Sequence, residues 1–170
     1  HCISLFSGIH KKLGWEEKKN EGHTTKLLRT TVLASLGYSN YEKVLNEAKK
    51  RFDGYLKTRQ MAANLRSVVY SLNAYQGDKQ TFNKIKELYI EAEMQEEKAR
   101  LLSAMASFKQ RDITKEALEF GLSENVRSLD TIIAVGRAAI NMDGGDMAWE
   151  FFEENWKEIK KRYGESTHMM

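Results

Sequence analysis

Apolar side chains recur along this chain at steps of three and four residues, the period that places them on one face of an α-helix. Polar residues fill the positions between them, and short clusters of Gly, Ser, Asn and Asp separate the periodic stretches. We find no convincing alternation of the kind that marks a half-buried strand. The pattern predicts helices near residues 2–12, 24–36, 40–57, 64–76, 79–92, 95–108, 113–121, 130–141 and 147–163.

Short connections join these predicted helices, so consecutive helices are expected to lie side by side in antiparallel pairs. We therefore expect an all-α fold whose helix pairs stack as a HEAT/armadillo-like α-solenoid rather than as a four-helix bundle. No repeat in residue identity is visible, so the tetratricopeptide and ankyrin patterns do not fit. Residues 1–170 are expected to form a single helical-repeat domain.

The stretch at 147–164, MAWEFFEENWKEIKKRYG, combines rings and charges. Asp146 is a plausible N-cap and Gly164 suits the end of the helix. The rings belong either to a buried helix stripe or to an exposed platform for stacking ligands. The charges occupy the opposite face, which favours the buried stripe. Its members, at steps of 3, 4, 3 and 4, are Trp149, Phe152, Trp156, Ile159 and Tyr163.

Net charge, apolar run length and cysteine count argue against several classes of function. The net charge is +3, divided between +6 for residues 1–60 and −3 for residues 61–170. So small a charge argues against a nucleic-acid scaffold. No apolar run approaches the roughly 18 residues of a membrane span. Cys2 is the only cysteine, which fits a reducing, cytoplasmic compartment.

Motifs for metal or nucleophilic chemistry are missing from the sequence. The zinc-protease signature H-E-x-x-H is absent, and no two histidines stand four residues apart among His1, His10, His23 and His168. We therefore expect no catalytic residue, metal site or cofactor in this chain. One acidic cluster is either a cation site or a solvated corner between helices; it comprises Glu91, Glu93, Glu96 and Glu97.

The segment 62–76 offers the candidate binding site. Arg66 and Tyr70 stand four residues apart on a strip beside an apolar helix face. Such a pair is suited to hold a carboxylate if it faces a cavity. The alternative is an arginine paired with a nearby acid inside the helix stack. The pattern does not choose between them.

Five segments together resemble a known family. They occur in this order: LGWEEKKNEGH (13–23), ANLRSVVY (63–70), MQEEKARLLSAMA (94–106), LSENVRSLDT (122–131) and AWEFFEENWKEIKKRYG (148–164). The chain resembles the C-terminal helical domain of the gluzincin zinc aminopeptidases, and most the puromycin-sensitive aminopeptidase branch. The resemblance covers residues 4–164 almost without a gap.

This resemblance implies a HEAT-like solenoid that caps a thermolysin-like catalytic domain of the same polypeptide. Such a domain encloses the catalytic chamber and helps to hold peptide substrates, while the zinc and its ligands lie elsewhere in the parent enzyme. The chain itself is then expected to be inactive, with Arg66 and Tyr70 meeting peptide carboxylates. The competing hypothesis is a stand-alone α-solenoid that binds a partner protein.

The resemblance also implies that this chain is part of a longer domain. The chain begins at His1 rather than at a methionine, and the family's solenoid continues beyond the last residue here. We therefore expect residues 1–170 to be a truncated part of a larger C-terminal domain. An uncovered solenoid end is expected to cause self-association.

Overall fold

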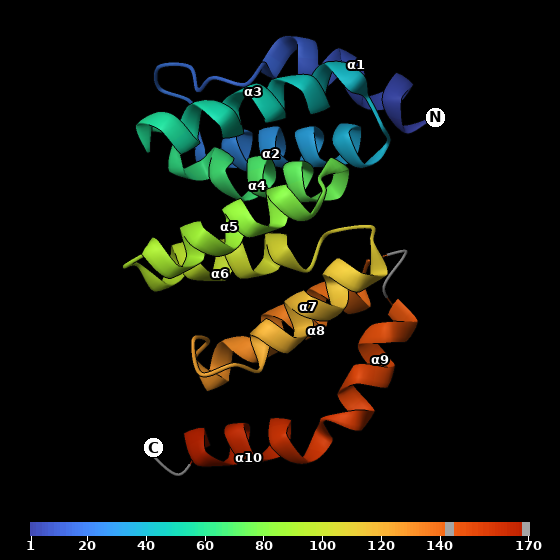
Figure 1. Cartoon of the computed structure of the whole chain (residues 1–170). Coiled ribbons are helices and arrows are strands. Elements are labelled where there is room, and N and C mark those ends of the chain that lie inside the picture. The colour runs from blue at the N-terminus through green and yellow to red at the C-terminus, as the bar shows by residue number, and fades with distance from the viewer. Residues whose placement is uncertain (142–144, 168–170) are drawn as a thin grey trace. The chain divides into compact units, whose positions relative to one another are not determined.

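The computed structural model describes residues 1–141 and 145–167, with side chains described as far as residue 162. Every regular element within these ranges is helical (Figure 1). The all-α prediction is therefore confirmed, with the packed helix pairs expected of an α-solenoid. The elements are α1 (Cys2–Leu13), α2 (His23–Tyr38), α3 (Glu42–Thr58), α4 (Ala63–Gln76), α5 (Lys79–Glu91), α6 (Gln95–Met105), α7 (Arg111–Gly121), η1 (Ser128–Asp130), α8 (Thr131–Ala139), α9 (Gly145–Glu154) and α10 (Trp156–Thr167).

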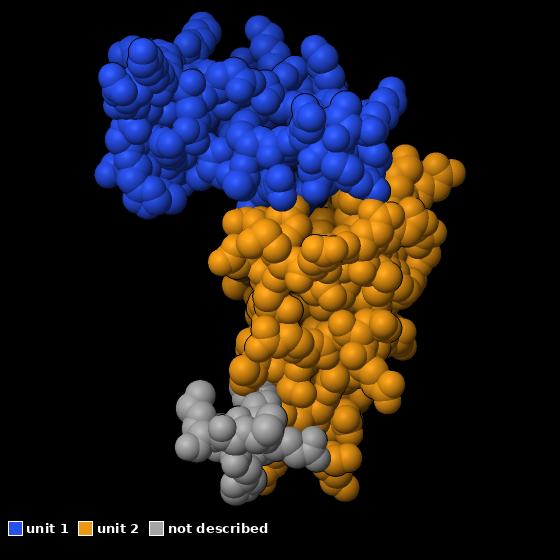
Figure 2. Space-filling view, turned by 90° about the vertical axis from the view of Figure 1, so that its left-hand side faces the viewer, with its two compact units in different colours: residues 1–73 blue, residues 74–170 orange. Residues whose placement is uncertain are grey.

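The chain divides into two compact units, residues 1–73 and residues 74–170, which Figure 2 shows in different colours. We call them unit 1 and unit 2. Unit 1 holds α1 to α3 and most of α4, and unit 2 holds the remaining helices. Each unit has a hydrophobic core of its own, so each is described by itself.

In unit 1, α2 is the central helix, because it packs against both α1 and α3. It also approaches α4 closely at Gly37, where an added Cβ would lie 2.3 Å from a methyl carbon of Leu72. Only glycine fits there while the buried Leu72 keeps its position. The fully or nearly buried core side chains of unit 1 include Val32, Leu33, Leu36, Val44, Ala48, Phe52, Leu65, Val69, Tyr70 and Leu72.

A buried amide joins α3 to α4. Nδ2 of Asn73 donates to the carbonyl of Ala48 at 3.0 Å and to the carbonyl of Val69 at 2.8 Å. Asn73 is only 4% exposed. Both amide hydrogens are thus satisfied inside the core, which removes the penalty for burying a polar group.

A buried ion pair fixes the loop between α1 and α2. Arg29 of α2 is fully buried, and its Nη2 donates to Oε1 of Glu21 at 2.6 Å and to the carbonyl of Leu13 at 3.4 Å. The guanidinium therefore holds the end of α1 and the following loop against α2. This hydrogen bond lowers the pKa of Glu21 below its ordinary value.

Unit 2 is built from helices that pack in sequence order: α5 against α6, α6 against α7 and α8, and α7 against α8. Two edge-to-face ring pairs stabilise this packing. Phe82 of α5 meets Phe108 of the loop between α6 and α7 at 5.7 Å, and Tyr89 of α5 meets Phe120 of α7 at 5.2 Å between centroids. Gly121 permits the closest backbone approach, since a Cβ there would lie 2.9 Å from that of Ala134.

The predicted helix at 147–163 is two helices, α9 and α10, that meet at Asn155. Nδ2 of Asn155 donates to the carbonyl of Phe151 at 2.9 Å, a carbonyl that also accepts from the backbone nitrogen of Asn155 at 3.0 Å. The proposed boundaries were also wrong. Asp146 lies in the first turn of α9 instead of capping it, and α10 continues through Gly164.

The predicted buried stripe is wrong for its two tryptophans. Trp149 is 61% exposed and Trp156 is 48% exposed, whereas Ala148, Phe151 and Ile159 are buried. The neighbouring stripe through Ala148 and Phe151 therefore faces the core, because α9 packs on α7 and α8 with that side. The side chain of Tyr163 lies outside the described residues.

The close approach at Gly37 gives a testable prediction. Replacing Gly37 with Ala is expected to destabilise the chain by about 1–3 kcal/mol, the usual cost of overpacking a core. The measurement is the free energy of unfolding in urea. The control is Gly54→Ala in α3, where a Cβ meets nothing within 4 Å; this change should stabilise by about 0.5–1 kcal/mol. Equal effects at both glycines would contradict the packing described.

The Glu21–Arg29 pair gives a pH prediction. Because the pKa of Glu21 is lowered in the folded chain, its stabilisation is fully present above the ordinary Glu pKa of about 4.3 and is lost as pH falls further. Glu21→Gln should therefore lower stability at pH 7 and flatten the decline between about pH 5 and pH 3.

Urea midpoints measured across this pH range check the prediction. Glu17→Gln is the matched control, since Glu17 pairs with Lys26 at the surface, where each side chain is about one-third exposed and the pair contributes little. If Glu21→Gln left the pH profile of stability unaltered, the stabilising role assigned to the Glu21–Arg29 ion pair would be wrong.

Candidate functional site

The residues predicted to bind substrate lie together in α4, within unit 1. The apolar side of this helix, with Leu65, Val69 and Leu72, is buried. Arg66 follows Leu65 by one residue, about 100° around the helix, and is therefore half-buried at the edge of the packed face.

Arg66 is held from two sides. Its Nε donates to the carbonyl of Met61 at 3.2 Å. Its guanidinium carbon lies 5.5 Å from the centroid of the Tyr55 ring, in α3. A cation over a ring at this distance is a favourable contact that also restricts the side chain. The guanidinium is thus positioned before any ligand arrives.

Tyr70 does not share an open strip with Arg66, as the spacing had suggested. It is fully buried, with its ring 5.7 Å from that of Tyr55 and 6.1 Å from that of Phe52. Four residues along a helix do place Arg66 and Tyr70 on neighbouring positions, but α3 packs over the tyrosine. Tyr70 therefore lies beneath Tyr55, which is itself only 8% exposed, and supports it from the core.

Beside this arginine lies a pocket of about 440 Å³. It is formed where the end of α3, the following loop and the start of α4 come together with the loop after α1. We call it the α3–α4 pocket. It is lined by Glu16, Arg51, Gly54, Tyr55, Thr58, Gln60, Met61, Ala62 and Leu65.

Arg51 forms the charged wall of the α3–α4 pocket. Its Nη2 donates to Oε1 of Glu16 at 2.6 Å, and its Nε donates to Oε1 of Glu47 at 2.9 Å. The guanidinium carbon also lies 4.8 Å from the centroid of the Trp15 ring. Two carboxylates thus balance the charge of Arg51.

These side chains can bind a polar ligand but bring no reactive group together. Among the described residues, no three His, Cys, Asp or Glu side chains gather as metal ligands do. His168 lies outside the described residues. The α3–α4 pocket is lined by hydrogen-bonding groups, the Tyr55 ring and the paired cation Arg51, the elements of a binding site. Arg66 is not a lining residue, but it contacts two residues that are, Met61 and Tyr55.

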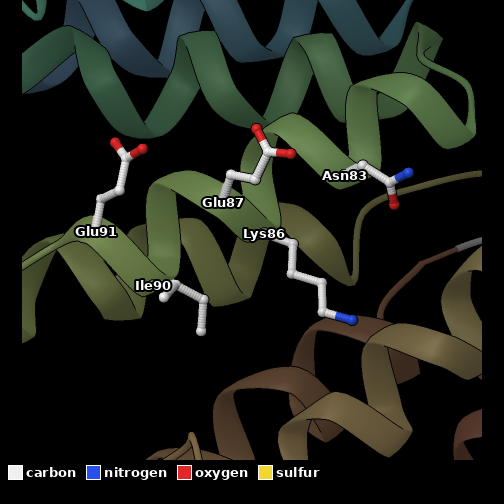
Figure 3. A pocket seen from close by; sticks show the side chains of 5 residues that line it. All are labelled: Asn83, Lys86, Glu87, Ile90 and Glu91. Carbon is white, nitrogen blue, oxygen red and sulfur yellow. The ribbon is translucent and has the colours of Figure 1, made fainter.

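A second pocket of about 440 Å³ lies along α5 and carries mixed charges (Figure 3). The carboxylates of Glu87 and Glu91 point to one side, while the Lys86 side chain extends away from both. Nζ of Lys86 lies 3.6 Å from Oε1 of Glu116 and 5.1 Å from the centroid of the Phe120 ring. Lys86 is thus engaged within unit 2, and we assign this pocket no chemistry.

The acidic cluster after α5 also offers no cation site in the described chain. Glu97 accepts a hydrogen bond from Nη1 of Arg100 at 2.9 Å, and Glu91 ends α5 while Glu96 lies in the first turn of α6. The interpretation as a solvated corner between helices fits the exposed Glu91, Glu93 and Glu96. It does not fit Glu97, which is only 7% exposed. Separately, no described helix is both long enough and apolar enough to cross a membrane.

Sequence reasoning proposed Arg66 as a binding residue but did not single out Tyr55 and Arg51, which line the pocket. The ion pair between Glu47 and Arg51 has i,i+4 spacing and was open to detection. The contacts of Arg66 with Tyr55, and of Arg51 with Glu16, join segments separated in sequence. No local pattern carries such contacts.

The whole chain, residues 1–170, matches a protein-family model described as "ERAP1-like C-terminal domain". It is 30% identical over 168 residues to Aminopeptidase M1 of Arabidopsis thaliana, covering 95% of this chain and 19% of that protein. It is 32% identical over 162 residues to Glutamyl aminopeptidase of Bitis rhinoceros, covering 94% of this chain and 17% of that protein. With Aminopeptidase 2, mitochondrial, of Saccharomyces cerevisiae it shares 24% over 168 residues, 98% of this chain and 18% of that protein. The chain thus spans about a fifth of the length of these relatives.

The different burial of Arg66 and Tyr70 gives a prediction. Tyr70→Ala should destabilise unit 1 by about 3 kcal/mol or more, since it removes a buried ring that packs on two others. Arg66→Ala should cost only about 1 kcal/mol, the value of an exposed cation–ring contact. Hydrogen exchange of the α3 and α4 amides measures both effects. A larger loss for Arg66→Ala would mean that the arginine is mainly structural.

Proposed function

Because the chain belongs to the family of ERAP1-like C-terminal domains, we propose that it is the non-catalytic helical domain of a zinc-dependent aminopeptidase. In this role it encloses the catalytic chamber and helps to hold peptide substrates. Cleavage of the N-terminal residue takes place on the catalytic domain of the same polypeptide. The chain alone has no peptidase activity.

The observation that carries this proposal is the match of the whole chain to the family model, together with relatives that are named as aminopeptidases. A domain that fills about a fifth of those proteins leaves room for a separate catalytic domain. In keeping with this, the sequence contains no H-E-x-x-H motif. In this proposal the zinc and its ligands belong to the part of the polypeptide outside these 170 residues.

Within this function, Arg66 is the residue that meets a carboxylate of the peptide. Its guanidinium is oriented by Met61 and Tyr55 beside the α3–α4 pocket. Tyr70 contributes by supporting Tyr55 from the core. A pre-oriented cation binds with less entropy cost than a free side chain, which suits a site that must hold flexible peptides.

The proposal also covers the binding partners, the cellular compartment, the subfamily and the extent of the domain. The partners are the catalytic domain of the same polypeptide and peptide substrates, with no role for nucleic acid or membrane. The compartment is the cytoplasm, and the subfamily is the puromycin-sensitive branch. Residues 1–170 form part of a larger C-terminal domain, so this chain in isolation is expected to self-associate.

The second candidate function is a stand-alone α-solenoid that binds a partner protein, favoured by the exposed apolar side chains described for α9 and α10. The reading frame distinguishes the two. An H-E-x-x-H motif encoded in the same frame supports the aminopeptidase, and its absence supports the binding module. Turnover of an aminoacyl fluorogenic substrate by the 170-residue chain with zinc would overturn both.

A kinetic prediction tests Arg66. In the full-length enzyme, Arg66→Ala should raise KM for peptides with a free C-terminal carboxylate by about tenfold, the value of one charge-assisted hydrogen bond. The kcat should change little, because the contact is the same in the ground and transition states. C-terminally amidated peptides should show a smaller effect.

Lys57→Ala is the matched control, since it removes an exposed positive charge from α3 in the same unit. It should leave the kinetics unchanged. Unaltered KM in Arg66→Ala, or an equal rise in both variants, would reject the assigned role of Arg66.

A further inference from the structure

Three aromatic rings form a continuous exposed surface on unit 2. The rings of Trp149 and Phe152 are stacked at 6.0 Å between centroids and 25° between planes, and the ring of Trp156 follows at 5.2 Å from Phe152. Trp149 is 61% exposed and Trp156 is 48% exposed, while Phe152 is half-buried. We call these three residues the aromatic strip.

The exposure of the aromatic strip is not explained by loose helices. On its other side, α9 buries Ala148 and Phe151 and packs on α7 and α8. In α10, Ile159 is buried, and Nη2 of Arg162 donates to the carbonyls of Ser123 at 3.0 Å and Val126 at 3.1 Å. Both helices are therefore docked, and the strip is an additional apolar surface.

Such a strip is unfavourable in water and is typical of an interface. Exposed apolar area costs about 25 cal/mol per Å² relative to burial, and aromatic residues are enriched at the centres of protein interfaces. The mutual ring contacts also hold the side chains in one arrangement, which lowers the entropy cost of covering them.

The charged residues of α9 and α10 indicate which charges a partner surface needs in order to dock on the aromatic strip. The segment of α9 contains four acidic residues and no basic one, Asp146, Glu150, Glu153 and Glu154. The α10 segment begins with a mainly basic run, in which Lys157, Lys160 and Lys161 are exposed. A complementary surface has an apolar centre, basic residues opposite α9 and acidic residues opposite α10.

We propose that the aromatic strip is the docking surface for another helical segment of the same polypeptide, one that lies outside residues 1–170. This inference rests on the proposed function, because it requires the longer aminopeptidase chain. The relatives are long enough to supply such a segment, since this chain covers only 17–19% of them. A tethered segment acts at an effective concentration in the millimolar range, which favours it over a second copy.

Hydroxyl-radical footprinting with peptide mass spectrometry tests the proposal on single tryptophans. The oxidation rates of Trp149 and Trp156 are compared between the full-length protein and the 170-residue chain at low concentration. The expected result is a several-fold lower rate for both in the full-length protein. Trp15, whose ring Arg51 covers within unit 1, is the internal reference for radical dose.

Equal rates in the two proteins would overturn the proposal. Slower oxidation that is lost when the full-length protein is diluted would also overturn it, because a second copy would then be the occupant. A thermal test is independent of this one. Trp149→Gln combined with Trp156→Gln should lower the melting temperature of the full-length protein more than that of the 170-residue chain. The control, Trp149→Phe combined with Trp156→Phe, should preserve the melting temperature of the full-length protein.

Turnover of an aminoacyl substrate by the same full-length protein separates the two proposals. Protected tryptophans without turnover would reject the aminopeptidase function and retain the docking surface. Turnover with freely oxidised tryptophans would reject the docking surface and retain the function.

Discussion

Every helix described here depends on its neighbours, because each is short. The α-helices have 9 to 17 residues, lengths at which an isolated helix is marginal in water. The chain has a single cysteine and therefore no internal disulfide, so burial of one helix face against the next supplies most of the stability. Such packing tolerates variation in side-chain identity provided that the apolar face is kept. The similarity to relatives at only 24–32% identity over nearly the whole chain is consistent with this tolerance.

The period of apolar residues predicted this architecture well because helix faces are a local property. Eight of the nine predicted helices correspond to single helices, with ends displaced by a few residues. The ninth failed because α9 offers two adjacent apolar stripes, one through Phe151 and one through Phe152. Periodicity alone does not show which stripe is buried, because that depends on how α9 packs against α7 and α8. The division between α9 and α10 at Asn155 is likewise not visible in the spacing of apolar residues.

The candidate site was only half predictable for a similar reason. The helical spacing of Arg66 and Tyr70 identified the segment, but not which of them faces solvent. Tyr55 lies over Tyr70 because α3 packs on α4, with Asn73 joining the two helices through its amide. The α3–α4 pocket is thus a product of tertiary packing. Its aromatic wall is suited to binding, while the catalytic chemistry belongs to the rest of the proposed enzyme.

The contact between Gly37 and Leu72 has a consequence for how such domains diverge. The space at position 37 admits only a hydrogen atom while Leu72 keeps its present place in the core. The two positions are therefore coupled through packing, although they belong to different helices and stand 35 residues apart. A side chain at the first position requires that Leu72 shift or become shorter, or that α4 move away from α2. Moving α4 would carry Arg66 and the wall of its pocket with it, so the choice of residue at a buried glycine also sets the geometry of a surface site.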